Sequence, residues 1–198
     1  RERLEIPQAR KVIAMLPGSR QSEVRNLADT YIATARLLLE RDPELRFLVP
    51  LATRETRLIF EEALHRNEAT ELPIRMLFGH AVEAMTAADV VLVASGTASL
   101  EAALLKRPMV ITYRIGKWQY RLMKHMAYLP WVGLPNILCN EGIVPELLQD
   151  EATPENLADA IEGWLQDAPR RAAVEARFMD LHLELKQDTA RRAAEAIL

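Results

Sequence analysis

Asp-Val-Val-Leu-Val-Ala-Ser-Gly-Thr-Ala-Ser-Leu-Glu, residues 89–101, is the stretch that decides the fold. Its first part, Val90–Ala94, is an apolar run with the length of a buried strand. Both faces of that strand would be apolar, as they are in parallel strands that lie between two layers of helices. Small residues around Gly96 follow at once, and a helical pattern begins after them. The stretch is therefore one strand-to-helix unit of an α/β protein.

The same unit recurs along the chain. Four further short apolar runs are expected to be strands: Val12–Leu16, Arg46–Leu51, Ile74–Phe78 and Met109–Tyr113. Apolar residues at three- and four-residue steps predict helices over 22–40, 54–66 and 97–106. This alternation predicts a doubly wound, Rossmann-like parallel sheet with right-handed crossovers. From Pro145 on we expect only helices, with Pro154 and Pro169 each in a first turn.

Composition is that of a folded domain with a sizeable core. Of the 198 residues, 49% are hydrophobic and 27% are charged, which excludes a disordered or collagen-like chain. The net charge of −3 gives no global bias toward nucleic acid. The single cysteine, Cys139, cannot form an internal disulfide, so we expect a reducing, cytosolic compartment. No apolar run approaches the roughly 20 residues of a membrane span. Since the chain begins without Met, we expect it to be a piece of a longer protein.

Most familiar enzyme motifs are absent from the sequence. No two of the seven glycines lie two residues apart, which excludes the GxGxxG dinucleotide fingerprint. Neither a Walker phosphate loop nor a GxSxG nucleophile elbow occurs. The four histidines are scattered and are accompanied by only one cysteine, so a zinc site is not expected. We therefore predict neither a metal nor a cofactor.

The first candidate binding turn is Leu16-Pro17-Gly18-Ser19-Arg20. It follows the first predicted strand, and open α/β sheets bind ligands at the carboxyl ends of their strands. A glycine lets backbone amides face an anion, the next helix adds its positive end, and Arg20 can bind two phosphate oxygens. The alternative is an ordinary strand-to-helix turn with a solvated arginine.

The second candidate turn is Ser95–Ser99, after the strand predicted at Val90–Ala94. Its small residues let several amides and hydroxyls face the strand end. Glu101 lies about one turn into the next helix, where a carboxylate would repel a phosphate unless it faced sugar hydroxyls. The alternative is a well-capped helix whose glutamate complements the helix dipole. A diphosphate that carries a ribose suits the two turns together.

Residues 102–140 form a basic segment without a single Asp or Glu. It holds six Lys and Arg residues and five of the eleven aromatic residues. Within it, 117–129 predicts a helix with one apolar and one basic face, which is typical of a surface that binds anionic lipid. The alternatives are a packed helix with a solvated basic face, and a nucleic-acid surface, which the acidic remainder of the chain disfavours. The residues expected to face a membrane are Arg114, Lys117, Trp118, Arg121, Lys124 and Trp131.

Together these motifs resemble the C-terminal half of the lipid-A-disaccharide synthase family. The similarity covers essentially the whole chain and adds these stretches to the two turns: Glu23-Val24, Lys106-Arg107-Pro108-Met109-Val110, Tyr113-Arg114 and Leu134-Pro135-Asn136. The resemblance implies a glycosyltransferase of the two-Rossmann (GT-B) architecture. It implies a bacterial enzyme, peripheral on the cytoplasmic side of the inner membrane, that joins UDP-2,3-diacylglucosamine to 2,3-diacylglucosamine 1-phosphate and releases UDP.

The resemblance also implies a donor site at the two turns. The turns would hold the diphosphate from two sides, Glu101 would bind the ribose, and the backbone near Phe78-Gly79-His80 would bind the uracil. The residues implied to contact the donor are Gly18, Ser19, Arg20, Phe78, Gly79, Ser95, Gly96, Thr97 and Glu101.

Catalytic roles are implied for Arg20 and for Asn136, whose Leu-Pro-Asn motif should face the cleft. The general base is expected in an N-terminal half. Residues 1–150 would form the UDP-sugar-binding domain, and 151–198 would be C-terminal helices that pack on it and on the N-terminal half. The implied partners are the lipid-linked donor and acceptor, an anionic membrane surface and the N-terminal half, with a homodimer also possible and no nucleic acid.

Two other functions fit parts of the pattern. The UDP-N-acetylglucosamine 2-epimerase type shares the architecture and a similar Ser-Gly-x-x-x-x-Glu turn. That family tends to carry a further glutamate just before the last one, where this chain has Leu100, and an enzyme of soluble sugars has no use for the basic segment. The second alternative is a non-catalytic nucleotide- or lipid-binding module.

Overall fold

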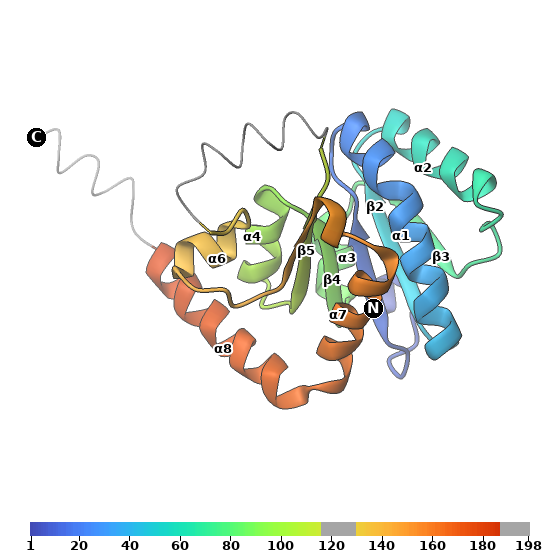
Figure 1. Ribbon diagram of the computed structural model, residues 1–198. Coiled ribbons are helices and arrows are strands. Elements are labelled where there is room, and N and C mark those ends of the chain that lie inside the picture. The colour runs from blue at the N-terminus through green and yellow to red at the C-terminus, as the bar shows by residue number, and fades with distance from the viewer. Residues whose placement is uncertain (116–129, 187–198) are drawn as a thin grey trace, which may run out of the picture.

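The fold is a six-stranded parallel sheet with helices on both of its faces (Figure 1). The structure is a computed structural model that describes residues 1–115 and 130–186. The strands are β1 (Val12–Leu16), β2 (Arg46–Leu51), β3 (Ile74–Phe78), β4 (Val90–Ala94), β5 (Met109–Tyr113) and β6 (Glu146–Leu148). The α-helices in the described ranges are α1 (Gln21–Arg41), α2 (Arg54–Arg66), α3 (Ala81–Ala87), α4 (Thr97–Leu104), α6 (Leu134–Cys139), α7 (Pro154–Gln166) and α8 (Ala168–Leu185).

The strand order is β3-β2-β1-β4-β5-β6, and each neighbouring pair is parallel. The chain therefore builds the sheet outward in one direction from β1 and then in the other from β4, which is the doubly wound topology predicted. All five strands predicted from the sequence are confirmed at their bounds. Pro154 and Pro169 lie in first turns, as expected from a residue whose missing N–H costs nothing there.

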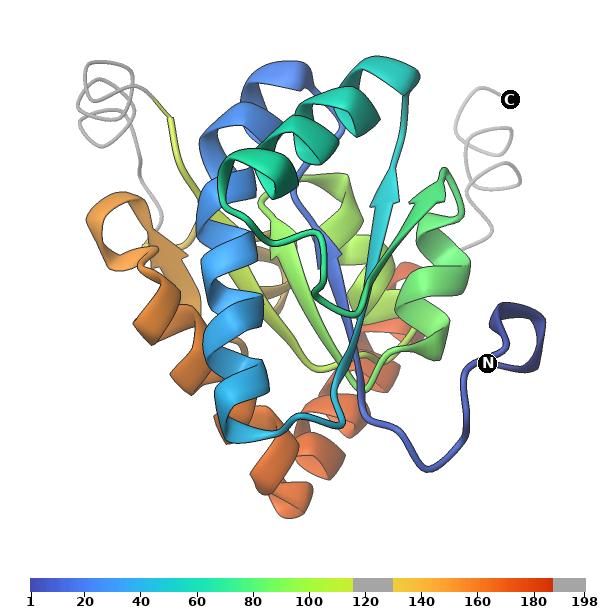
Figure 2. The ribbon, with the colours of Figure 1, turned by 90° about the vertical axis from the view of Figure 1, so that its right-hand side faces the viewer.

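The helices form two layers (Figure 2). On one face α1 packs against both α2 and α7, and on the other α4 packs against α3, α6 and α8. Every residue of β1 and β4 is buried. These central strands are apolar on both sides because each side meets a helix layer, so the core continues through the sheet.

Two expectations about the edges of the sheet are wrong. The chain after Pro145 is not only helical, because Glu146–Leu148 pairs with β5 as a sixth strand. Three half-buried residues are too few to show a strand period, which explains why the pattern missed them. At the other edge, Ile74–Phe78 is not apolar on both faces: it includes the exposed residues Arg75 and Phe78, because an edge strand is covered less than a central one.

The described part of residues 151–198 packs on the sheet. Trp164 of α7 is fully buried, and its Nε1–H donates to the Met109 carbonyl at 2.9 Å. Arg41 of α1 makes ion pairs with Asp159 and Glu162 of α7 at 2.7 and 2.8 Å. Helix α8 packs against α4, and its residues Val174, Phe178 and Leu181 are buried. The packing of this region on an N-terminal half stays a prediction.

Candidate ligand cleft

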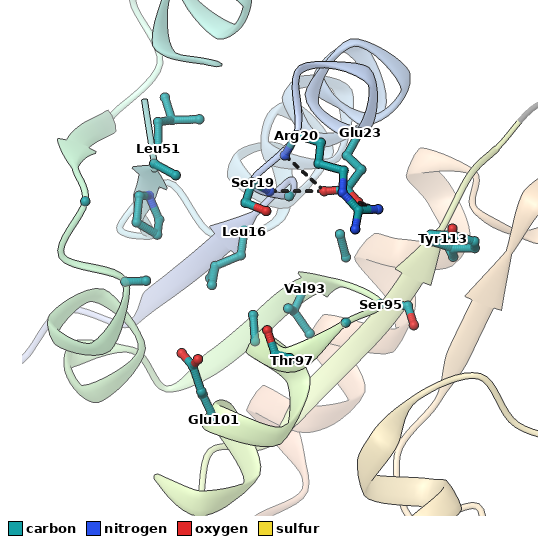
Figure 3. Close-up of a pocket in the computed structure, with 18 residues that line it drawn as sticks. Leu16, Ser19, Arg20, Glu23, Leu51, Val93, Ser95, Thr97, Glu101 and Tyr113 are labelled. Carbon is teal, nitrogen blue, oxygen red and sulfur yellow. Dashed lines mark hydrogen bonds and ion pairs between the residues drawn. The ribbon is translucent and has the colours of Figure 1, made fainter. Parts of the chain in front are cut away.

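A cleft of about 480 Å³ opens at the carboxyl ends of β1, β2 and β4 (Figure 3). It lies where the strand order reverses between β1 and β4, the point at which open α/β sheets bind ligands. Its volume is in the range of small-molecule sites. The residues predicted for the donor that line it are Gly18, Ser19, Arg20, Gly79, Ser95, Gly96, Thr97 and Glu101. The structure thus brings both candidate turns and the predicted ribose ligand to one cavity.

The first turn depends on Gly18. Its φ of +117° lies in the left-handed region that favours glycine. A Cβ at this position would also lie 2.4 Å from Glu23 Oε2, so no other residue fits without a shift. Arg20 then forms the N-cap of α1, and 78% of its side chain is exposed at the cleft. The sequence thereby places a cation and the positive end of a 21-residue helix at the cleft wall.

Glu23 faces back into this turn. Its Oε2 accepts hydrogen bonds from the backbone N–H groups of Ser19 and Arg20, at 3.1 and 3.2 Å (Figure 3). Its Oε1 lies 3.4 Å from Nη1 of Arg20. Two of the amides that an anion could use therefore already hold a carboxylate.

The second turn is ordered by Gly96 and Ser99. Gly96 has a φ of +153° and is the N-cap of α4, and its carbonyl accepts from Ser99 Oγ at 2.7 Å. Ser95 is fixed on both sides, since its N–H donates to the Thr112 carbonyl at 2.8 Å and its Oγ–H to the Val132 carbonyl at 3.1 Å. The Ser99 N–H also donates to the Gly96 carbonyl, at 3.2 Å, which leaves the N–H groups of Thr97 and Ala98 as the donors that this end of α4 offers to a ligand.

Glu101 lies one turn into α4, is exposed and lines the cleft, on the side away from Arg20 (Figure 3). A carboxylate separated from the cationic wall can accept hydrogen bonds from sugar hydroxyls without facing a phosphate. This is the placement expected from the sequence, and a contact between Glu101 and the ribose stays a prediction.

The residues predicted around the uracil are divided by the structure. Gly79 lines the cleft and donates its N–H to the Leu51 carbonyl at 2.8 Å. Phe78 is not among the lining residues, and its side chain is exposed at the sheet edge. His80 is the N-cap residue of α3 and places Nδ1 3.2 Å from Glu83 Oε1, a hydrogen bond that lowers the pKa of Glu83. A uracil contact through this backbone stays a prediction.

The expectation that Asn136 faces the cleft is wrong for this structure. The residue is fully buried and absent from the cleft lining. Its Nδ2 donates to the Val144 carbonyl and to Glu146 Oε1 at 2.9 and 2.8 Å, and its Oδ1 accepts from the Val144 N–H at 3.0 Å. Because the amide is satisfied on both ends by the chain that returns to β6, it holds the loop together instead of reaching a ligand.

Glu146 completes this loop. Its carboxylate accepts the backbone N–H groups of Val132 and Gly133 at 2.8 and 3.0 Å, besides the Asn136 amide. Since the Val132 carbonyl in turn holds Ser95 Oγ, the network supports the second turn from behind.

Sequence reasoning missed several lining residues. Leu51 ends β2 and Ala52 follows it, Tyr113 ends β5, and Glu23 lies in the first turn of α1. The rule applied to β1 and β4 would have found the first three, because β2 and β5 end at the same edge of the sheet.

Of the residues expected at a membrane, only Arg114 and Trp131 are described; Lys117, Trp118, Arg121 and Lys124 lie outside the described residues. Arg114 is exposed, and its Nη1 donates to Thr30 Oγ1 at 3.1 Å. Trp131 is half-buried. Within residues 1–115 and 130–186, no helix is both long and apolar enough to cross a bilayer, and no group of His, Cys, Asp and Glu could hold a metal ion.

A doubly wound parallel sheet with two glycine turns at its switch point defines a Rossmann-like type of α/β domain. Among solved structures, the C-terminal domain of a glycosyl transferase group 1 family protein (LpcC) from Francisella tularensis has the same fold. The structural match covers 94% of this chain and 91% of that domain, with a TM-score of 0.59 and 14% sequence identity. The class is therefore a Rossmann-like α/β domain with the fold of that glycosyl transferase domain.

Within that class, the chain belongs to the lipid-A-disaccharide synthetase family, whose model matches residues 1–198. It is 74% identical to a lipid-A-disaccharide synthase of Aromatoleum aromaticum and 70% identical to one of Azoarcus sp. (strain BH72), in both cases over the whole chain. The chain spans about half the length of these relatives, 51% of each.

Proposed function

We propose that this chain is the donor-binding half of an enzyme that transfers 2,3-diacylglucosamine from UDP-2,3-diacylglucosamine to 2,3-diacylglucosamine 1-phosphate. Membership of the lipid-A-disaccharide synthetase family supports this activity and favours it over the epimerase. The single observation that carries the assignment to this half is that both glycine turns and Glu101 line one cleft at the switch point of the sheet.

In the proposed complex the diphosphate lies between the two turns. Arg20 contributes a guanidinium that can bind two phosphate oxygens, and the amides at the start of α4 add their dipole from the other side. Glu101 binds the ribose hydroxyls, and the backbone at Gly79 lies beside the uracil. This arrangement keeps the anionic part of the ligand with the cation and the hydroxylated part with the carboxylate.

The reaction breaks the bond between the anomeric carbon of the donor sugar and the terminal phosphate oxygen of UDP. A hydroxyl of the acceptor attacks that carbon and loses its proton to a base in the other half of the enzyme, and UDP keeps the bonding electron pair. Arg20 and the α4 amides stabilise the negative charge that develops on the departing phosphate, which is the usual means of lowering such a barrier.

The proposed location rests on the family resemblance, which implies the cytoplasmic face of the bacterial inner membrane. Both proposed substrates are lipid-linked, and residues 106–131 of the basic segment supply the contact with anionic lipid. The N-terminal half of the same enzyme, and a second copy of the chain, are the protein partners predicted.

Titration of the chain with UDP tests donor binding. UDP should bind the wild type, and Gly96→Ala should weaken it at least about tenfold, because the turn requires a φ of +153°. Gly163→Ala is the matched control, since Gly163 lies in α7 and an added methyl group there would meet only Arg170 Nη1, at 3.8 Å. A folded chain that does not bind UDP, or equal binding by Gly96→Ala, overturns the proposed site.

Transfer is tested with a chimaera in which this chain replaces the matching half of the Aromatoleum aromaticum relative. The chimaera should make the disaccharide, and Gly96→Ala within it should not. A folded chimaera without transferase activity would contradict the proposed reaction.

A further inference from the structure

The carboxylate of Glu23 fills the concave side of the first turn. It accepts both the Ser19 and the Arg20 N–H groups through one oxygen, and its other oxygen faces the Arg20 guanidinium. Glu23 lines the cleft, although only 19% of its side chain is exposed. The position that two amides and a guanidinium would give to a phosphate oxygen is thus taken by an anion of the chain itself.

Capping of α1 does not account for all of this geometry. In a capping box, the third residue of the helix accepts the N–H of the N-cap residue, here Arg20. Glu23 goes one residue further and also accepts the N–H of Ser19, which lies outside the helix. It approaches so closely that a Cβ at position 18 would meet its side chain at 2.4 Å. The turn therefore encloses a carboxylate that lines the cleft and occupies the two amides that a phosphate would use.

We propose that Glu23 is a specificity residue that weakens the binding of the product UDP more than that of the UDP-linked donor. The inference rests on the proposed function, because it assumes that a nucleoside diphosphate occupies this cleft. Glu23 makes and breaks no covalent bond in this role.

Glu23 weakens the binding of a phosphate whether the phosphate displaces the carboxylate or binds beside it. If a phosphate oxygen replaces the carboxylate at the two amides, the ligand gives up part of its binding free energy to displace it. If the phosphate binds beside the carboxylate, like charges repel at short range. Two unit charges about 4 Å apart repel by about 1 kcal/mol even in water, which corresponds to about a fivefold change in affinity.

The effect differs between donor and product because their charges differ. The terminal phosphate of UDP carries about one more negative charge near neutral pH than the same phosphate esterified to a sugar, since its second pKa is about 6. Glu23 therefore opposes UDP more strongly as soon as the sugar has left. A carboxylate in this place favours exchange of product for fresh donor.

Glu23→Gln tests the inference, because the amide oxygen of glutamine can still accept the two N–H groups while the charge is lost. Glu55→Gln is the matched control: Glu55 lies in the first turn of α2, at the same edge of the sheet, but does not line the cleft. Dissociation constants of the 198-residue chain for UDP, UDP-glucose and uridine are measured calorimetrically at pH 8 and low salt. We expect Glu23→Gln to bind UDP about fivefold tighter and UDP-glucose about twofold tighter, with uridine unchanged.

The possible outcomes separate the inference from the proposed function. If the folded wild type does not bind UDP, the proposed function of this cleft fails and the inference fails with it. If the wild type binds UDP but Glu23→Gln binds it equally or more weakly, only the inference is overturned, and Glu23 merely holds the turn. An equal gain for UDP and UDP-glucose, a chain that binds UDP but not UDP-glucose, or an equal gain in Glu55→Gln, also overturns it.

Discussion

Replacing Arg20 with alanine is expected to weaken the binding of UDP about tenfold and to leave the binding of uridine nearly unchanged. A hydrogen bond to a charged group contributes about 1.5–3 kcal/mol. The lower end applies here because 78% of the Arg20 side chain is exposed, so water competes for it. Part of its interaction is also already directed at Glu23, 3.4 Å away. A loss of about 1.4 kcal/mol is a tenfold change in the dissociation constant.

Glu101→Ala is the counterpart of this change. Both ligands keep the ribose, so the variant should weaken UDP and uridine by a similar factor. Calorimetric titration of UDP and of uridine into each variant and into the wild type gives four ratios of dissociation constants, variant to wild type. Arg25→Ala serves as the control, because Arg25 is an exposed arginine of α1, the helix that Arg20 caps, and does not line the cleft.

The reasoning would be refuted by equal losses of UDP and uridine in Arg20→Ala, since uridine has no phosphate for the guanidinium to bind. It would also be refuted if Arg25→Ala matched Arg20→Ala, because the effect would then reflect the general charge of the helix end.

Asn136→Ala should lower the free energy of unfolding by about 2–4 kcal/mol in urea titrations, because it leaves the buried N–H and carbonyl groups of Val144 unpaired; a loss below about 1 kcal/mol would contradict the buried network. Burial raises the pKa of Tyr31 above its usual value of 10.0, so the folded state favours the neutral phenol, and this contribution to stability is complete below about pH 10 and is lost as the pH rises further. Tyr31→Phe should therefore flatten the alkaline loss of stability, and an unchanged alkaline slope would speak against it. Arg121→Glu combined with Lys124→Glu should release the protein from anionic vesicles, since each basic residue near the surface contributes about 1 kcal/mol; unchanged co-sedimentation would mean that this basic face is only solvated.

The central part of the fold could be predicted because its physical cause is local. Val12–Leu16 and Val90–Ala94 lie between two helix layers, so their burial appears in the sequence as unbroken apolar runs. The edges lack that signal: Glu146–Leu148 is a strand only because β5 offers it a free edge, a property of the assembled sheet and not of three residues.

The candidate site was predictable to the extent that strand ends determine it. Gly18 and Gly96 each follow a central strand, and parallel strands bring their carboxyl ends to one edge. The direction in which a side chain points was not predictable in the same way. A Leu-Pro-Asn motif fixes the residue type at position 136, but the return of the chain to Val144 turns its amide inward. Glu23 was missed as a cleft residue because capping and anion binding use the same amides.

The pairing of β1 with β4 has a consequence for what the cleft can accommodate. Leu16 lies in register with Val93, so the two glycine turns leave the sheet side by side, at a separation set by ladder hydrogen bonds of roughly 4.8 Å spacing. That spacing is set by backbone hydrogen bonds and is common to all parallel sheets. Side chains around the rim, such as Tyr113 and Ala52, can therefore change the shape of the cleft, while the paired strands hold the starting points of the two turns in place.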